Sequence, residues 1–570
     1  MKQFKKKIVL SGVVLSTMLA LRANDNLKLG IVPQPNEVKL TADVGDIQKS
    51  FVMNKNNPTV IIYDIKQKEL KNVAQYLKKF IENSPYDVKV IIFERGAGIC
   101  KKWSDKTNFI NLSIKPLCGC LRYPEQYHLS VNNNKAIEIS APSANGVFYG
   151  VQTLLQLMPT DIYKKSAEKV SKDIIINAVE IKDKPLFTKF RGLHVDFSRH
   201  FRTLEETKQI IDWMAMHKLN TLQMHLTDDQ GWRIEIKKYP KLTTVGGIGD
   251  NSHKHKGEAK FFTQEQLKEI IAYAKSRYIK IIPEIDIPGH MEAAIRAYPE
   301  LASPSDLRAT KKVIRIDDKG FEFVKDVLTE VDELFSPEYI HVGFDEINLG
   351  SKKPIYDNKQ ITEFGRKVTN FIKNDLKKTP IVWDDAFEKG LDNDKEILVH
   401  WWRTGKNHWW RKMEMTIDQK LQKYNQPYIN SNAAFIYFDM KNVKEDKRGA
   451  GWAKPISVAE IYNHDIFADL KDYDVKKRIL AQGTIAATWS ESIDTMAEFE
   501  KRVFPRLAAF SENAWALPKS MAKGNKPTWI QYRDNILIPK QLERYKAMNL
   551  RYWGDAQKIT ELKSLKKYNK

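Results

Sequence analysis

Two adjacent carboxylates, Asp345 and Glu346, follow directly on a short apolar run at residues 339–342. The run has the pattern of a buried parallel strand, and α/β enzymes place their chemistry at the carboxyl ends of such strands. An isolated Asp-Glu pair would most simply be a solvated turn. Four other strand-like runs in the same half of the chain, at residues 194–196, 225–229, 283–286 and 381–384, also end in acidic residues. A cluster of functional side chains is therefore the favoured interpretation.

The expected strand ends carry acids, one arginine, one histidine and several aromatic residues. They are Asp196, Arg199, Asp228, Asp229, Asp286, His290, Asp345, Glu346, Trp383, Asp384, Trp402, Tyr437, Asp439, Trp489 and Glu491. Aromatic faces stack on the C–H face of a pyranose ring, and carboxylates and arginine bind its hydroxyls. The set therefore predicts a sugar site. Metal-dependent hydrolysis is the weaker alternative, because His290 has no histidine at ligand spacing and the chain has no His-Glu-x-x-His motif. We expect no metal and no cofactor.

The adjacency of Asp345 and Glu346 restricts the mechanism. Most glycosidases place two carboxyl groups on either side of the anomeric carbon, roughly 5 Å or more apart. Neighbouring residues on one turn are poorly placed for that, but they could work from one side of the sugar. Glu346 would be the general acid, and Asp345 would orient a nucleophile that belongs to the substrate, the carbonyl oxygen of a 2-acetamido group. Substrate-assisted catalysis of this kind is a known exception among glycosidases.

From residue 190 onward, strand-like and helix-like segments alternate. Strands are expected at residues 190–197, 221–226, 279–285, 339–342, 380–383, 397–401, 427–430 and 483–489. Helices are expected at residues 204–217, with Thr203 as N-cap, at 263–277, with a Thr263/Gln266 capping box, at 321–334 and at 361–376. Eight such strands predict a (β/α)₈ TIM-type barrel. A doubly wound open sheet is the alternative, but residues 196–200 are not the glycine-rich phosphate loop that it would need.

The chain is too long for one small core, so more than one domain is expected. Residues 24–185 are predicted to form a smaller α/β (α+β) accessory domain. Its expected strands are residues 59–63, 88–93, 127–131 and 136–140, and its helices are residues 68–82 and 146–158. The catalytic domain is predicted at residues 186–550, followed by a lysine-rich tail at 551–570.

The first 23 residues have the pattern of a signal peptide. Lys2, Lys5, Lys6 and Lys7 precede an apolar stretch at residues 8–21 that is too short to favour a spanning helix. We expect an exported protein, periplasmic or secreted, with no stable membrane anchor. Export permits disulfides, but the pairing among Cys100, Cys118 and Cys120 stays open.

The formal net charge is +22, and the lysines are spread along the whole chain. An excess of positive charge can indicate that a protein binds a polyanion such as a nucleic acid. No nucleic-acid-binding motif accompanies it, so a lysine-rich solvated surface is the favoured interpretation and no nucleic-acid partner is expected.

Four motifs resemble glycoside hydrolase family 20, the β-N-acetylhexosaminidases, and the resemblance runs from about residue 31 to 553. The motifs are RGLHVDFSRHF (191–201), HLTDDQGWR (225–233), PEIDIPGH (283–290) and HVGFDE (341–346). Two positions depart from the family pattern. Phe344 stands where a small residue is usual, which leaves the shape of the pocket open, and Tyr278 stands where glycine is common.

The resemblance implies roles at the matching positions. Arg199 would bind the C3 and C4 hydroxyls, Asp345 and Tyr437 would hold the acetamido group, and Glu346 would act as acid and then base. The remaining implied residues are the supporting pair Asp228 and His290, the wall residues Trp383, Trp402 and Trp489, and the C4 and C6 contacts Asp439 and Glu491. The implied activity is exo-acting hydrolysis of terminal β-linked GlcNAc and GalNAc from an oligosaccharide or glycoconjugate. A catalytically impaired sugar-binding relative is the alternative, and the natural glycan stays open among chitin, peptidoglycan and host-glycan fragments.

Overall fold

The structure is a computed structural model that describes residues 25–41, 46, 50–96, 107–117, 123–132, 136–304, 312–348, 354–392, 394–403, 415–467, 475–516 and 526–561. The expected signal peptide and Cys100, Cys118 and Cys120 lie outside these residues. The chain divides into two compact units. One contains residues up to Thr188, Tyr462–Asp465 and the segment from Leu507 onward, and the other contains Lys189–Ile461 and Ile466–Arg506.

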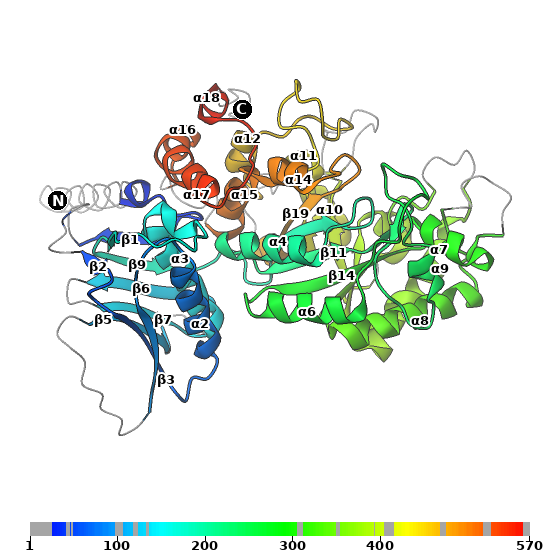
Figure 1. The fold of residues 1–570 in the computed structure, drawn as a ribbon. Helices are drawn as coiled ribbons and strands as arrows, with labels where there is room; N and C mark the ends of the chain where they lie inside the picture. Colours follow the sequence, from blue (N-terminus) through cyan, green and yellow to red (C-terminus); the bar gives the residue numbers. More distant parts are fainter. Residues whose placement is uncertain are drawn as a thin grey trace, which may run out of the picture. The chain divides into compact units, whose positions relative to one another are not determined.

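The second unit is built on a closed barrel of eight parallel strands, so the predicted fold class is confirmed (Figure 1). In barrel order the strands are β10 (Phe190–Asp196), β11 (Thr221–His225), β14 (Lys280–Ile287), β15 (Tyr339–Gly343), β16 (Thr379–Trp383), β17 (Leu398–Trp401), β18 (Tyr428–Asn430) and β19 (Ala481–Thr488). Strand β19 pairs with β10 in parallel, from Phe190 opposite Gly483 to Val195 opposite Thr488, and closes the barrel.

Apolar side chains fill the amino-terminal end of the barrel interior, and polar ones occupy the carboxyl end. The apolar cluster consists of Phe190, Ile282, Tyr339, Ile381, Leu398, Ile429 and Ile485. Phe190, Tyr339 and Leu398 are the first residues of their strands. Burial of these side chains stabilises the barrel and leaves the opposite end, where the strands finish, for the functional residues.

The helices around the barrel begin where the sequence predicts capping residues. Thr203 and Glu206 form a capping box at α4 (Leu204–Met216), and Thr263 and Gln266 form another at α6 (Gln264–Lys275). Helix α8 (Asp318–Phe335) begins three residues before the predicted start because Asp317 caps it. Helix α9 (Asn358–Asn370) continues as a π-helical turn, η5 (Phe371–Asp375). Other α-helices of this unit are α5 (Lys241–Thr244), α7 (Glu292–Ala297), α10 (Ile417–Tyr424), α11 (Ala433–Ile436), α13 (Val475–Leu480) and α14 (Met496–Val503). Helix α12 (Val458–Asn463) begins in this unit, and its last two residues are counted with the first unit.

The first unit contains a seven-stranded mixed sheet in the order β1-β9-β6-β7-β5-β3-β4. Its strands are β1 (Glu37–Leu40), β3 (Thr59–Asp64), β4 (Val90–Arg95), β5 (Asn108–Ile114), β6 (Tyr127–Asn132), β7 (Ala136–Ala141) and β9 (Val179–Asp183). Helices α2 (Leu70–Glu82) and α3 (Ala144–Leu157) pack side by side on one face of this sheet (Figure 1). Strands β2 (Phe51–Met53) and β8 (Ile174–Ile176) pair separately.

The C-terminal segment belongs with the first unit. The sequence predicts a catalytic domain that runs to residue 550, whereas the unit around the barrel ends at Arg506. The physical reason is a set of long-range hydrogen bonds. Arg544 in α17 (Leu542–Ala547) donates to Gly30 O at 2.7 Å and to Gln156 O at 2.9 Å. Trp515 Nε1, at the end of α15 (Arg506–Trp515), donates to Asp183 Oδ2 at 3.0 Å.

The rest of the C-terminal segment is also helical. It contains α16 (Trp529–Tyr532), the π-helix η8 (Arg533–Gln541) and α18 (Ala556–Glu561), where Ile559 is buried. Within the parts of the chain that the structure describes, no helix combines the length and the hydrophobicity needed to span a bilayer.

Candidate active site

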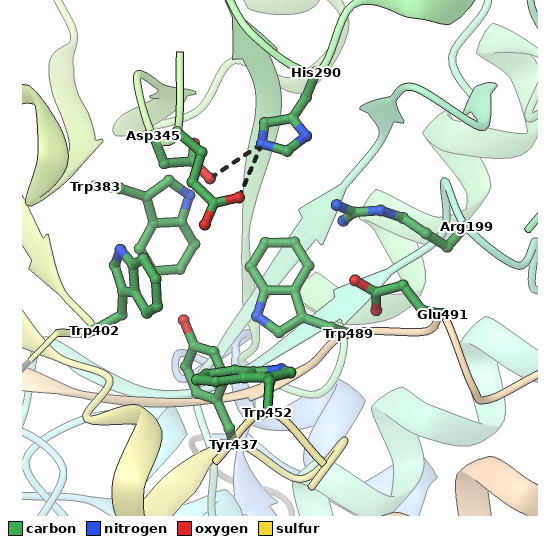
Figure 2. A pocket seen from close by; sticks show the side chains of 10 residues that line it. Arg199, His290, Asp345, Trp383, Trp402, Tyr437, Trp452, Trp489 and Glu491 are labelled. Atoms are coloured by element: carbon green, nitrogen blue, oxygen red, sulfur yellow. Dashed lines mark ion pairs between the residues drawn. The ribbon is translucent and has the colours of Figure 1, made fainter. Parts of the chain in front are cut away.

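A pocket of about 240 Å³ opens at the carboxyl end of the barrel strands (Figure 2). It is lined by Arg199, His290, Asp345, Glu346, Trp383, Trp402, Tyr437, Trp452, Trp489 and Glu491. Nine of these ten residues were expected from the sequence, and the tenth is Trp452. The remaining expected residues are buried and do not line the pocket; they are Asp196, Asp228, Asp229, Asp286, Asp384 and Asp439.

A turn in left-handed backbone conformation presents the two adjacent carboxylates. Gly343, Phe344 and Glu346 have φ values of 67°, 66° and 48°. A side chain at Gly343 would collide with Asp286, since a Cβ there would lie 1.8 Å from Asp286 Oδ1. Non-glycine residues with positive φ cost about 1–3 kcal/mol each and cluster at functional sites. The turn aims the Asp345 and Glu346 side chains into the pocket.

Phe344 does not crowd the pocket. Its side chain is fully buried, and its ring lies 6.4 Å from the Phe364 ring of α9. Its N–H donates to Ile287 O at 3.0 Å. The bulky residue therefore fills space between the barrel and α9, which answers the question that the sequence leaves open. Tyr278 has a φ of 57°, a conformation that glycine adopts most easily.

His290 connects both pocket carboxylates to Asp228. Its Nε2 lies 3.7 Å from Asp345 Oδ2 and 3.7 Å from Glu346 Oε2 (Figure 2). Its Nδ1 lies 3.2 Å from Asp228 Oδ1. Burial alone would lower the pKa of His290, but the carboxylates of Asp228, Asp286 and Asp345 raise it well above its ordinary value. An imidazolium therefore faces the two pocket carboxylates at neutral pH.

Arg199 is fixed by buried carboxylates while it lines the pocket. Its Nη2 lies 2.6 Å from Asp228 Oδ2, and its Nη1 lies 3.4 Å from Asp196 Oδ2. The guanidinium also lies 5.0 Å from the centre of the Trp489 ring. Burial would raise the pKa of Asp228, but Arg199 and His290 hold it well below its ordinary value. Asp228 is thus the negative centre that positions both cations.

Asp345 combines burial with an unsatisfied oxygen. Among the described residues, its Oδ1 has no hydrogen-bond partner, although the residue is only 8% exposed. Burial raises the pKa of Asp345 to about 6, with His290 opposing and Glu346 reinforcing the shift. A buried carboxylate without a partner is costly, so this oxygen is suited to accept an N–H or O–H from a ligand.

Aromatic rings form the rest of the wall. The Trp402 ring stacks on Tyr437, with centroids 6.2 Å apart and an interplanar angle of 15°. Trp452 meets both rings edge-on, at 6.3 Å and 5.9 Å. The hydroxyl of Tyr437 points into the pocket toward the side that carries His290 (Figure 2). The arrangement offers apolar faces together with one phenolic donor.

Trp452 is the lining residue that sequence reasoning missed. It follows Gly449, Ala450 and Gly451 in a loop, not at a strand end. The loop is placed by Ala450 N–H, which donates to Asp439 O at 2.8 Å. The only signal in the sequence is a tryptophan beside two glycines a short distance after Tyr437 and Asp439.

Asp439 and Glu491 form an acidic pair at the Arg199 side of the pocket. Burial, reinforced by Glu491, raises the pKa of Asp439 well above its ordinary value. Burial also raises the pKa of Glu491, against the attraction of Arg199. Glu491 lines the pocket beside Arg199 (Figure 2). Asp439 is 2% exposed and is not among the lining residues. Carboxyl groups of this kind bind sugar hydroxyls readily in either protonation state.

Several histidine and carboxylate groups of the site lie close enough to hold a metal ion. They include Asp286, His290 and Asp345 at the pocket and His194, His225 and Glu284 beneath it. Ion pairs of His290 with Asp345 and of His225 with Glu284 lie within these groups, whereas neither carboxylate oxygen of Asp286 has a hydrogen-bond partner among the described residues. The prediction of a metal-independent site stays a prediction.

Two family models cover most of the chain. The model described as "Glycosyl hydrolase family 20, catalytic domain" matches residues 188–518, and the model described as "Glycosyl hydrolase family 20, domain 2" matches residues 28–184. The chain belongs to glycoside hydrolase family 20. The resemblance read from the four motifs is therefore confirmed.

Individual relatives agree with the family assignment. The chain is 30% identical over 504 residues to a beta-hexosaminidase of Porphyromonas gingivalis, a match that covers 83% of this chain and 60% of the relative. It is 30% identical over 419 residues to a beta-hexosaminidase of Vibrio furnissii, with 68% and 64% covered. The chain thus spans less than two thirds of the length of both curated relatives. The GH20 beta-N-acetylhexosaminidase structure from Streptomyces coelicolor A3(2) superposes with a TM-score of 0.77 at 27% identity, covering 93% of this chain and 98% of that one.

Proposed function

We propose that this chain is an exo-acting β-N-acetylhexosaminidase that removes terminal β-linked GlcNAc, and also GalNAc, with retention of configuration through a substrate-assisted mechanism. The observation that carries the proposal is that His290 Nε2 lies 3.7 Å from one oxygen of Asp345 and 3.7 Å from one oxygen of Glu346. Both carboxylates are therefore on the same wall of the pocket. That placement suits an acid beside a residue that orients the acetamido group, and not two groups on opposite faces of a sugar.

The first step uses Glu346, whose side chain is 26% exposed, to protonate the glycosidic oxygen. Asp345 accepts the acetamido N–H, and the Tyr437 hydroxyl donates to the acetamido carbonyl. The carbonyl oxygen then attacks the anomeric carbon as the leaving alcohol departs with the proton from Glu346. The product is a cyclic oxazolinium, and the Asp345 carboxylate balances its positive charge.

The second step reverses the roles. The Glu346 carboxylate takes a proton from a water that attacks the anomeric carbon, the oxazolinium ring opens, and the β-configured sugar is released. Asp345 must be ionised throughout. Its pKa of about 6 means that it is largely ionised at neutral pH and protonated in acid. The cationic intermediate would favour ionisation further.

Substrate binding would use the remaining lining residues. Arg199 and Glu491 lie together on one side of the pocket and would hold ring hydroxyls, while Trp383, Trp402 and Trp489 would pack against the sugar and its acetyl group (Figure 2). Asp439, buried next to this side, would support the hydroxyl contacts of Glu491.

Hydrolysis of chromogenic β-GlcNAc, β-GalNAc and β-glucose substrates by the purified chain tests the activity. We expect turnover of both acetamido sugars and almost none of the glucoside, because glucose lacks the internal nucleophile. Binding of GlcNAc without hydrolysis would instead support a catalytically impaired sugar-binding relative. Equal hydrolysis of the glucoside would rule out the acetamido group as nucleophile.

The route is tested at Asp345. A thiazoline mimic of the cyclised sugar should bind far more tightly than substrate, and Asp345→Asn should lose both that inhibition and turnover. Asp318→Asn, at a side chain that is 95% exposed, is the matched control and should retain both. A 2-fluoro sugar that leaves a glycosyl adduct on Asp345, detected by mass spectrometry of the intact protein, would show double displacement instead.

Export is a separate proposal that rests on the amino-terminal pattern of lysines and apolar residues at positions 2–21. Amino-terminal sequencing of protein recovered from the periplasm or medium should show cleavage near Ala23. Recovery of uncleaved protein from the cytoplasm would contradict it. Initial rates on chitin, peptidoglycan and host-glycan fragments would then rank the possible natural glycans.

A further inference from the structure

Below the pocket, one fully buried carboxylate gathers side chains from four other barrel strands. Glu284 of β14 is 0% exposed. Trp383 Nε1 donates to its Oε1 at 3.0 Å, and Gln223 Nε2 donates to its Oε2 at 2.7 Å. Three imidazole nitrogens also face the carboxylate, namely His225 Nδ1 at 3.2 Å, His194 Nε2 at 3.3 Å and His341 Nδ1 at 3.5 Å.

Two series of contacts connect Glu284 to residues of the pocket. The first is direct, since Trp383 is a pocket residue whose indole N–H is tied to Glu284 and whose ring stacks on His400 at 4.2 Å. The second runs through His225, whose Nε2 lies 3.0 Å from Asp228 Oδ2. Asp228 in turn contacts Arg199 and His290.

We propose that Glu284 is a positioning residue for the reaction, whose carboxylate fixes the Trp383 indole in the pocket wall and keeps His225 as an imidazolium bridging Glu284 to Asp228. The kinetic part of this inference rests on the proposed function. The inference about the charge state of His225 does not depend on the proposed function.

The geometry favours an imidazolium because the two ring nitrogens of His225 face two different carboxylates. A neutral imidazole has one N–H and could donate to only one of them. An imidazolium donates from Nε2 to Asp228 and forms an ion pair with Glu284, whose Oε1 lies 3.2 Å from Nδ1 without hydrogen-bond alignment. The electrostatics agree, since Glu284, Asp228 and Asp196 raise the pKa of His225 well above its ordinary value against the effect of burial. Burial lowers the pKa of His341 to about 4 and also lowers that of His194. His225 is therefore the imidazole of this layer that carries charge.

One contact supports the rival arrangement. Arg199 Nη1 lies 3.3 Å from His225 Nε2, a distance at which a neutral imidazole could accept from the guanidinium. In that arrangement the Nε2 lone pair would face Asp228 Oδ2 at 3.0 Å, which is repulsive. The titratable and charged groups that surround His225 are Glu284, Asp228, Arg199, Asp196, His194, His341 and Asp286.

The direct test is nitrogen NMR of the full chain labelled with ¹⁵N-histidine, with the His225 signals assigned by their loss in His225→Asn. We expect both ring nitrogens of His225 to be protonated at neutral pH in the wild-type protein. In Glu284→Gln, which keeps the shape and removes the charge, we expect a neutral His225. A neutral His225 in the wild-type protein would overturn the proposal, whether or not Glu284→Gln folds and whether or not the protein hydrolyses hexosaminides.

Kinetics supply the second readout. Glu284→Gln should lower kcat/KM by up to about 100-fold, the scale expected for misplaced catalytic groups. Loss of the carboxylate lowers the pKa of His225, so the basic limb of the kcat/KM profile should move toward lower pH, by about 1 or more on the pH scale. In Glu284→Asp, the basic limb of the kcat/KM profile should return part of the way to its wild-type pH. An unchanged profile in a folded Glu284→Gln variant would contradict the role.

Gln223→Met is the matched control. It removes the amide that donates to the other oxygen of Glu284, and it leaves Trp383 and His225 in contact with the carboxylate. A purely structural role for Glu284 predicts that both variants lower the melting temperature and that neither moves the pH profile. The positioning role predicts a moved profile in Glu284→Gln alone.

Discussion

The indole Nε1 of Trp402 donates a hydrogen bond to Asp385 Oδ2 at 2.9 Å. Arg403 Nε lies 3.4 Å from the same oxygen. Burial, opposed by Arg403 and reinforced by the nearby Asp384 and Asp345, raises the pKa of Asp385 to about 7. One wall of the pocket therefore depends on a carboxyl group that titrates close to neutral pH.

This relationship predicts that Asp385 makes the folded state less stable as the pH rises. A carboxyl whose pKa is raised on folding holds a proton in the folded state that the unfolded chain has already lost, so its stability contribution falls between its ordinary pKa and the folded value. For Asp385 that window runs from 3.8 to about 7. Asp385→Asn keeps an acceptor for Trp402 and cannot ionise.

The stability of Asp385→Asn relative to wild type should therefore increase from about pH 4 to about pH 7. A tenfold difference in proton affinity between the folded and unfolded states corresponds to about 1.4 kcal/mol, so a gain on the order of a few kcal/mol is expected at the upper end. Urea denaturation across that range measures it. A difference between the two proteins that does not change with pH would contradict the assignment.

Trp452 should contribute to binding, because it lines the pocket. Trp452→Ala removes the edge contacts to Trp402 and Tyr437 and opens one side of the pocket. Aromatic pairs are worth about 0.5–1.5 kcal/mol beyond area burial, so we expect kcat/KM to fall on the order of 10-fold, mainly through KM. Trp452→Phe should retain most of the activity. Unchanged kinetics in Trp452→Ala would show that Trp452 does not contribute to substrate binding.

The barrel could be predicted because each of its strands is a local apolar run that ends in polar residues. Strand β15 and the pair Asp345 and Glu346 are the clearest case. The strands of the accessory sheet are harder to predict from the sequence. Strand β5 begins with Asn108, whose side chain is buried because it donates to Val52 O at 2.7 Å, and no local pattern reveals a partner so far away in the chain.

Site residues that depend on distant partners could not be predicted either. Glu284 is part of a motif found in the sequence, but its importance comes from contacts with β11 and β16. The grouping of the C-terminal segment with the first unit likewise depends on a distant contact, the hydrogen bond from Arg544 to Gly30 O. Local patterns identify which residues end strands, and tertiary contacts decide which of them act together.

Arg199 should affect both substrate affinity and stability. In Arg199→Ala, Asp228 and Asp196 lose a buried cation, and loss of one partner of a buried pair costs about 3–5 kcal/mol. KM should rise because the hydroxyl contacts are lost. Arg199→Lys should recover part of the stability by restoring a charge, but little of the KM, because the fork geometry is absent.

Urea denaturation and steady-state kinetics on the same samples separate the two effects. If Arg199→Lys recovered wild-type KM, a simple charge would be sufficient and the bidentate hydroxyl contact would be wrong. If Arg199→Ala were folded with unchanged KM, Arg199 would serve only to hold Asp228.

Glu346 is assigned as the group that protonates the leaving oxygen, and this role predicts a dependence on the leaving group. Glu346→Gln keeps the side-chain shape and removes the proton, and general acid catalysis is typically worth about 10²- to 10⁴-fold. A loss of that size is expected for disaccharides, whose alcohols leave poorly, and a smaller loss for activated aryl glycosides, which need little protonation. Glu333→Gln, at an exposed position of α8, is the control and should match wild type on both. The measurement is kcat/KM on both substrates. Equal losses on the two would mean that Glu346 does not donate the proton, and would transfer that role to another group within reach of the glycosidic oxygen.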